Sequence, residues 1–352
     1  MIDGFNRLFR KYNLSEMHKY ISVITFIFFL FCKNSIDAQI KYTVETPLIL
    51  DTVISSTENF KGLNWADPRD NFVDDWLLPT GLNSTDNYDA ILIKADSILS
   101  AFKRTGANTI RLPINPPSVL QSWWASYSAA IDKASAKGMK VIVAYWEAAS
   151  SKDGKVDDID AFWKMWNEVV NKYKSDTNVY FEIFNEPHGY SVSDLKELYF
   201  KWLTTYTDVP RRRIMLDGAG YARDVNSIGD DNRFDGCLLS FHEYTWFDPS
   251  YKTVADWEIP VKSIQYPKRT VVTEFGIPMT TGKDYLGGRV NDVQIAYLQG
   301  MTDQMHSLNI GGVYWPGLRA GDTFSLLTLK GNSVSVNNVS GFVRIQYAWR
   351  NK

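Results

Sequence analysis

The chain repeats one pattern along most of its length: a short apolar run rich in β-branched residues, followed by a longer segment with helical periodicity. Strands that alternate with helices favour parallel βαβ units. Eight such units within about 290 residues fit a single (β/α)₈ barrel. The runs that predict its strands are Lys61–Trp65, Thr109–Pro113, Lys140–Tyr145, Val179–Phe184, Arg213–Leu216, Leu238–Phe241, Thr270–Phe275 and Gly311–Trp315.

The segments between these runs predict the helices of the barrel. An open doubly wound sheet is the alternative, but no glycine-rich phosphate loop follows the first strand. We therefore expect one barrel domain over residues 39–352, with only weak helical periodicity after Leu216. The predicted helices are Tyr88–Thr105, Leu120–Lys137, Ile159–Lys174, Ser193–Thr205, Thr253–Ser263, Val290–Leu308 and Val339–Trp349.

Residues 1–38 differ from the rest of the chain. Basic residues precede an apolar run, Tyr20–Cys32, and Ala38 offers a small residue before a cleavage point. This pattern is typical of a signal peptide, and the run is shorter than the roughly 20 residues that span a membrane. We expect export to the medium, the periplasm or the cell surface, without stable membrane insertion after cleavage. A retained anchor is the alternative, and bulky Phe31 disfavours lipid attachment at Cys32.

The charge and the cysteine content argue against a nucleic-acid-binding protein and against a fold stabilised by disulfides. The net charge is −2 and the basic residues are spread along the chain, whereas a nucleic-acid-binding face needs clustered Lys and Arg. Removal of residues 1–38 leaves Cys237 as the single cysteine, so no internal disulfide forms. We expect a monomer that its hydrophobic core stabilises.

Polar and aromatic residues follow the predicted strands at the points where the apolar runs stop. In a (β/α)₈ barrel the active site lies at these carboxyl ends. Two carboxylates accompanied by Asn, Arg, His, Tyr and Trp at matching strand ends indicate a catalytic site. These residues are Asn64, Arg111, Trp146, Asn185, Glu186, His242, Tyr244, Glu274 and Trp315.

The ordered set of motifs resembles glycoside hydrolase family 5. The resemblance extends from Gly62 to the final helix and rests on Ile110–Pro113, Tyr180–Pro187, His242–Tyr244, Val272–Gly276 and Tyr314-Trp315. It implies a retaining β-glycosidase with catalytic carboxylates on strands four and seven. In this chain those positions are Glu186, as acid/base, and Glu274, as nucleophile.

The chemistry of glycoside cleavage agrees with this pairing. One carboxyl group protonates the leaving oxygen while a second meets the anomeric carbon, about 5–5.5 Å away in a retaining enzyme. Strands four and seven face each other across a barrel mouth, as this spacing requires. Glu274 must stay ionised, so we expect hydrogen bonds from Arg111 and Tyr244. We expect Asn185 to bind the sugar 2-hydroxyl, and His242 to orient Glu186 or to bind sugar.

Two further carboxylates are expected to be structural. Glu182 lies deeper on the fourth strand, as an interior partner of Arg111, and Glu243 faces away from its neighbours His242 and Tyr244. One departure from the family is Trp146, because many members carry a His after strand three. This departure concerns the geometry of the sugar-binding subsites and leaves the reaction class unchanged.

Some aromatic and charged residues are candidates for sugar binding. Trp146, Trp246 and Trp315 lie in loops or at strand ends, where sugar rings stack on aromatic faces. Arg319 and Asp322 follow strand eight and either hold hydroxyls or pair with each other. Other tryptophans lie on predicted helices and are expected in the core: Trp163, Trp166 and Trp202.

Other catalytic chemistries are not supported. The histidines lack the spacing of metal ligands, no Gly-x-Ser-x-Gly motif occurs, and no cofactor is expected. We predict an O-glycosyl hydrolase, similar to endo-β-glycanases and cellulases, whose binding partner is a carbohydrate, a β-glycan. The alternatives are an exo-acting glycosidase, a transglycosylase, or a catalytically inactive carbohydrate-binding barrel.

Overall fold

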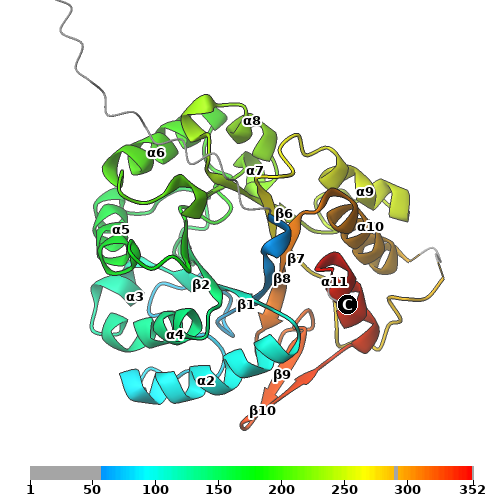
Figure 1. Cartoon of the computed structure of the whole chain (residues 1–352), viewed down its shortest axis with the longest axis horizontal. Coiled ribbons are helices and arrows are strands. Elements are labelled where there is room, and N and C mark those ends of the chain that lie inside the picture. Colours follow the sequence, from blue (N-terminus) through cyan, green and yellow to red (C-terminus); the bar gives the residue numbers. More distant parts are fainter. Residues whose placement is uncertain (1–56, 289–291, 351–352) are drawn as a thin grey trace, which may run out of the picture. The chain divides into compact units, whose positions relative to one another are not determined.

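Eight parallel strands close into a barrel in the computed structural model, which describes residues 57–288 and 292–350. The strands pair in chain order and the barrel closes where β1 pairs with β8, with helices around the outside (Figure 1). This confirms the predicted (β/α)₈ fold. The barrel strands are β1 (Lys61–Trp65), β2 (Thr109–Ile114), β3 (Lys140–Tyr145), β4 (Val179–Glu182), β5 (Ile214–Asp217), β6 (Leu238–Glu243), β7 (Thr270–Phe275) and β8 (Gly311–Leu318).

The helices begin where side-chain caps satisfy their first backbone N–H groups. Asn87, Asp158, Ser191 and Thr253 each accept such a bond at a helix start. The helices are α2 (Tyr88–Arg104), α3 (Pro116–Leu120), α4 (Trp124–Ala136), α5 (Ile159–Tyr173), α6 (Val192–Thr205), α7 (Ala219–Ala222), α8 (Val225–Gly229), α9 (Val254–Lys262), α10 (Val293–Leu308) and α11 (Val339–Ala348), with short 3₁₀ turns η1 (Thr57–Asn59), η2 (Arg211–Arg213) and η3 (Asn232–Phe234).

The interior of the barrel is layered. An apolar cluster that includes Phe60, Ile142 and Met215 fills the end where the strands begin. A second apolar cluster, with Ala144 and Trp146 among its members, lies where the strands end. Buried polar and charged side chains occupy the space between, and they form the site described below.

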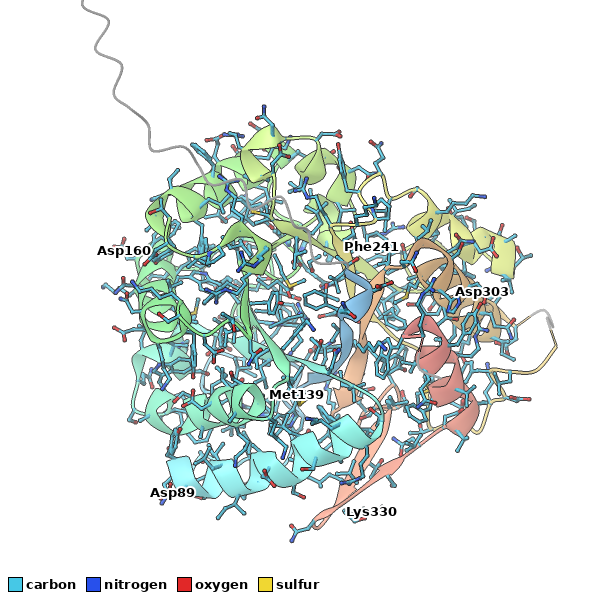
Figure 2. The ribbon with its side chains drawn as sticks, viewed as in Figure 1. Asp89, Met139, Asp160, Phe241, Asp303 and Lys330 are labelled. Atoms are coloured by element: carbon cyan, nitrogen blue, oxygen red, sulfur yellow. The ribbon has the colours of Figure 1, made fainter. Side chains whose placement is uncertain are left out.

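The main core lies between the strands and the surrounding helices. Figure 2 shows Met139, which is fully buried just before β3, among packed side chains, whereas Asp89 and Asp160 lie on the outside in the first turns of α2 and α5. Acidic residues are favourable at helix starts because the helix dipole is positive there. Cys237 is buried in this core as a free thiol.

Several predicted boundaries were wrong by a few residues, for local reasons. The predicted helix Leu120–Lys137 is α4, which begins only at Trp124, because a separate short helix that Asn115 caps, with Pro116 as its first residue, precedes it. The weak periodicity after Leu216 corresponds to two short helices, α7 and α8. Strand β4 is shorter than predicted and ends at Glu182.

A β-hairpin near the end of the chain was not predicted. Strands β9 (Leu327–Lys330) and β10 (Ser333–Val336) pair antiparallel, and β9 joins the barrel sheet through β8. The turn contains Gly331 with a φ of 58°. The signal was present in the sequence, since Gly-Asn between two alternating runs is typical of a tight hairpin.

The predicted signal peptide lies outside the described residues. Among the helices that are described, none combines the length and the apolar character needed to cross a membrane.

Candidate active site

Arg111, on β2, is the centre of the buried polar layer. Its guanidinium group donates two hydrogen bonds to the Glu182 carboxylate, and so the pairing expected for Glu182 is present. It also donates to Asn64 Oδ1 at 3.0 Å and to Asn185 Oδ1 at 2.7 Å. A further bond goes to Oε1 of Glu274. One buried cation thus connects the ends of β1, β2, β4 and β7.

Glu274 is held by two donors. Arg111 binds Oε1, and the Tyr244 hydroxyl donates to Oε2 at 2.8 Å. Burial raises the pKa of Glu274 to about 7, and the contacts with Arg111 and Tyr244 act against this rise. These donors stabilise the ionised carboxylate, as charge-assisted hydrogen bonds do.

Glu186 lies across the barrel mouth in a different environment. Its Oε1 is 3.0 Å from His242 Nδ1, and its side chain keeps 16% exposure. Burial and the neighbouring Glu274 raise the pKa of Glu186 well above its ordinary value. Glu186 therefore holds a proton more strongly than Glu274 does. Two carboxyl groups in unlike environments, one of them held by donors to its ionised form, suit an acid and a nucleophile in one site.

His242, on β6, stands between the two carboxyl groups. Its Nδ1 is 3.0 Å from Glu186 and 3.7 Å from Glu274. One oxygen of each carboxyl group and a ring nitrogen of His242 all lie within 4.8 Å of one another. Burial and Arg111 lower the pKa of His242 well below its ordinary value, which favours the neutral imidazole.

Asn185 directs an amide into the same space. Its carbonyl oxygen is bound to Arg111, whereas its buried Nδ2 has no hydrogen-bond partner among the described residues. A buried donor without a partner is costly. A ligand hydroxyl beside Glu186 would satisfy it.

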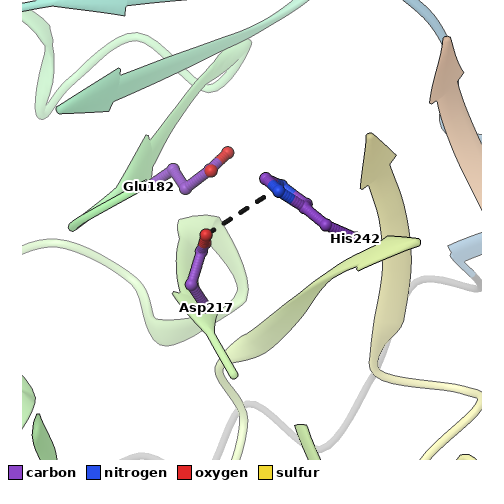
Figure 3. A group of neighbouring side chains, drawn as sticks. All are labelled: Glu182, Asp217 and His242. Atoms are coloured by element: carbon purple, nitrogen blue, oxygen red, sulfur yellow. Dashed lines mark ion pairs between the residues drawn. The ribbon is translucent and has the colours of Figure 1, made fainter. Parts of the chain in front are cut away.

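A second cluster of potential metal ligands lies deeper: Glu182, Asp217 and His242 (Figure 3). Both oxygens of Glu182 already accept bonds from Arg111. A cation placed there would face the guanidinium charge at close range, so these residues do not suit a metal ion.

Trp146 and Trp315 pack on each other at the mouth. Their rings are stacked with centroids 5.4 Å apart, and their exposed fractions are 2% and 9%. Phe72 contacts Trp146 edge-on at 4.7 Å. Both tryptophans were predicted to offer faces to sugar, and the stack covers one face of each ring.

Exposed aromatic rings lie on the other side of the mouth. Trp246 is 57% exposed and stacks on Tyr244 with centroids 4.3 Å apart. Tyr221 is 41% exposed and stacks on His188, two residues after Glu186, at 3.9 Å. Phe247 contacts both Tyr221 and Trp246. Sequence reasoning named Trp246 but missed Tyr221, which lies in a connection of weak periodicity.

Three other predictions concern residues whose polar groups are already paired with other groups of the protein. Arg319 pairs with Asp322 at 2.9 Å, so the reading in which these two bind each other holds. Asn64 supports Arg111, and its amide donates to the Thr273 and Tyr314 carbonyls. Asn64 is therefore a support of the polar layer. Glu243 pairs with Arg223, away from the site, as expected.

The family of the chain follows from its sequence. The profile described as Cellulase (glycosyl hydrolase family 5) matches residues 78–317, which is more than half of the chain. The chain belongs to glycosyl hydrolase family 5. This cellulase family consists of O-glycosyl hydrolases. The chain is therefore an O-glycosyl hydrolase, and it carries two carboxyl groups at its barrel mouth. No curated protein sequence matches.

Solved structures with the same fold include cellulases. An endocellulase from Pyrococcus horikoshii in complex with cellotetraose is 16% identical, with a TM-score of 0.61, covering 82% of this chain and 92% of that one. An endo-β-1,4-glucanase from Xanthomonas axonopodis pv. citri is 18% identical, with a TM-score of 0.54 and coverages of 72% and 90%. XacCel5A in complex with cellopentaose is 16% identical, with a TM-score of 0.58 and coverages of 82% and 99%. At this identity the likeness shows the shared barrel.

Sequence reasoning missed one buried carboxyl group of this family 5 site. Asp217 ends β5, and its Oδ2 accepts a 3.0 Å hydrogen bond from the backbone N–H of Glu186. Figure 3 shows it facing His242. The signal was its position at a strand end, which the predicted strand Arg213–Leu216 left one residue outside.

Proposed function

We propose that this glycosyl hydrolase cleaves β-1,4-glucan chains internally with retention of anomeric configuration. Glu186 is the acid/base and Glu274 the nucleophile. The proposal rests on one observation: an oxygen of Glu186 and an oxygen of Glu274 lie within 4.8 Å. This agrees with the roughly 5–5.5 Å of retaining enzymes and is too short for the ~6.5–9.5 Å of inverting ones.

The environments of the two groups assign their roles. Glu274 accepts bonds from Arg111 and Tyr244 and loses its proton first, so it attacks the anomeric carbon. Glu186 keeps its proton and delivers it to the leaving oxygen. Water then enters from the side of the departed group, and Glu186 removes its proton as the glycosyl–Glu274 bond breaks.

The substrate class is inferred from the family and from the fold relatives that carry cello-oligosaccharides. The leaving group must lie on the Glu186 side, where exposed Tyr221 stacks on His188. Sugar rings pack their C–H faces on such rings. Asn185 Nδ2 is the donor for a hydroxyl of the sugar that is attacked.

A trapping experiment tests the mechanism. A 2-deoxy-2-fluoro β-cellobioside with an activated leaving group slows the breakdown of the glycosyl-enzyme more than its formation. We expect the protein mass to rise by one glycosyl group, with the label on Glu274 after proteolysis. A Glu274→Gln variant should show no label and almost no turnover. A label on another carboxylate, or full activity of the variant, contradicts the assignment.

An exo-acting enzyme is the second candidate, and contacts between two loops favour it. The loop after β3 meets the loop after β1, since Ser150 N–H donates to Asp74 and Lys152 lies 4.3 Å from the Phe72 ring. Together with the Trp146–Trp315 stack, this contact joins the loops after β1, β3 and β8 over one part of the mouth. An exo enzyme releases one short product from the start, whereas an endo enzyme first yields mixed lengths and a rapid fall in viscosity.

We also propose that the enzyme is exported. The basic and apolar composition of residues 1–38 supports this. N-terminal sequencing of protein from the culture medium or periplasm should begin at residue 39. An intact N-terminus in the cytoplasm contradicts export.

A further inference from the structure

We propose that Asp217 is a positioning residue that holds the acid/base Glu186 in its working orientation. It acts through one carboxylate oxygen, which accepts the main-chain N–H of Glu186 and faces the imidazole of His242. The inference rests on the role proposed for Glu186. Nothing in the family motifs of the sequence pointed to this residue.

The main-chain hydrogen bond is made by Glu186, whose backbone is strained. Glu186 has a φ of 55°, in the left-handed region that side chains other than glycine seldom adopt. Such a conformation persists only where the surroundings fix it. β4 has already ended at Glu182, and Asp217 Oδ2 accepts the Glu186 N–H at 3.0 Å. The Asp217 side chain thus takes the place of a strand partner.

The same oxygen also faces His242, whose buried Nε2 has no hydrogen-bond partner among the described residues. Asp217 Oδ2 lies 4.0 Å from His242 Nε2, drawn as the dashed line in Figure 3. The opposite ring nitrogen, Nδ1, is 3.0 Å from Glu186 Oε1. A single oxygen therefore touches the backbone of the acid/base and faces the ring that touches its carboxyl group.

Asp217 is itself rigidly placed. It is completely buried, and its backbone carbonyl accepts a 2.9 Å hydrogen bond from the Tyr199 hydroxyl on α6. Burial and Glu182 raise the pKa of Asp217, and Arg111 lowers it. The charged and titratable groups around it are Arg111 on β2, Glu182 on β4, Glu186 after β4, His242 on β6 and Tyr199 on α6.

The test compares Asp217→Ala with Asp217→Asn on aryl β-cellobiosides whose leaving groups differ in acidity. Loss of positioning should weaken protonation of poor leaving groups, while good ones need little help. We expect Asp217→Ala to lose about tenfold more kcat/KM on phenyl than on dinitrophenyl cellobioside, a fraction of the 10²–10⁴-fold typical of general acids. Asp217→Asn keeps an oxygen at the Oδ2 position and should restore the wild-type dependence.

A double variant separates positioning from general damage. If Asp217 acts through Glu186, adding Asp217→Ala to Glu186→Ala should cause no further loss on phenyl cellobioside, because residues that act as a unit are not additive. Equal losses of Asp217→Ala on all leaving groups, or an Asn variant as impaired as the Ala variant, overturn the proposal. If Asp217→Ala does not melt cooperatively, Asp217→Ser replaces it and the same outcomes apply.

Two controls complete the design. Asp231 also accepts a backbone N–H, from Arg233, but it precedes β6 at the opposite end of the barrel. Asp231→Asn should leave the leaving-group dependence unchanged. Glu186→Ala alone tests the proposed function: if it shows no leaving-group dependence, the acid/base role fails, and if it does while Asp217→Ala does not, only this inference fails.

Discussion

The Tyr244 hydroxyl donates a 2.8 Å hydrogen bond to Oε2 of Glu274, the carboxylate oxygen that Arg111 does not bind. The two donors occupy both oxygens of the group that must attack the sugar. Both counteract the rise in pKa that burial causes at Glu274. The hydroxyl is thus part of what keeps Glu274 ionised while Glu186 retains its proton.

Removal of this hydroxyl should move the acidic limb of the pH–rate profile. Turnover requires ionised Glu274 and protonated Glu186, so the rate falls below the pKa of the first and above that of the second. Tyr244→Phe removes a bond that lowers the pKa of Glu274. Hydrogen bonds to charged groups contribute about 1.5–3 kcal/mol, so the acidic limb should move to higher pH by about one to two units. Measurement of kcat/KM against pH detects the shift.

The control for this profile is a tyrosine hydroxyl outside the site. Tyr206 donates to the Trp163 carbonyl, and Tyr206→Phe should leave both limbs where they are. An unchanged acidic limb in Tyr244→Phe, or a shift towards lower pH, contradicts the role of the hydroxyl.

Arg111 should matter to stability as much as to catalysis. Arg111→Met leaves Glu182 and Glu274 buried without their cation, and the loss of one partner of a buried pair costs about 3–5 kcal/mol. Adding Glu182→Gln removes one of the uncompensated charges, so the double variant should be more stable than Arg111→Met alone. Urea unfolding of the two variants checks the order, and equal or reversed stabilities contradict it.

The exposed and buried tryptophans of the mouth should respond differently to truncation. Trp246→Ala removes a ring that is 57% exposed. Stability should change by no more than about 0.5 kcal/mol, while KM for cellopentaose rises and kcat/KM for dinitrophenyl cellobioside changes little. Trp146→Ala removes a buried ring and should destabilise the fold by about 3–5 kcal/mol. Thermal melts and kinetics on both substrates separate the two effects.

The sequence predicted the barrel because its strands are buried on both faces and therefore read as continuous apolar runs. Strands such as Lys140–Tyr145 and Thr270–Phe275 have the predicted bounds. The paired carboxyl groups could be predicted for the same reason, since each one directly follows or ends such a run. Boundaries failed where turn chemistry decides them, as at Asn115.

Contacts between distant strand ends could not be read from the sequence. The stack of Trp146 on Trp315 depends on how the loops after β3 and β8 fold, which their residue types do not encode. In the sequence, Asp217 is an ordinary residue at the end of a strand. Its role depends on the left-handed backbone of Glu186, which places the Glu186 N–H against the Asp217 carboxylate. Side-chain partners set by the closure of the barrel appear only in three dimensions.

The stereochemistry of the first product tests the proposed double displacement independently of any variant. An oxygen of Glu186 and one of Glu274 lie within 4.8 Å, which leaves no room for water between Glu274 and an anomeric carbon. The carboxylate must therefore attack first, and water arrives only afterwards on the face that the leaving group vacated. Two inversions give net retention, so a β-linked substrate should release the β-anomer before mutarotation equilibrates it. Proton NMR of the anomeric signals during the first minutes resolves the two anomers. Initial appearance of the α-anomer would mean a single displacement by water, with carboxyl groups farther apart than they are here.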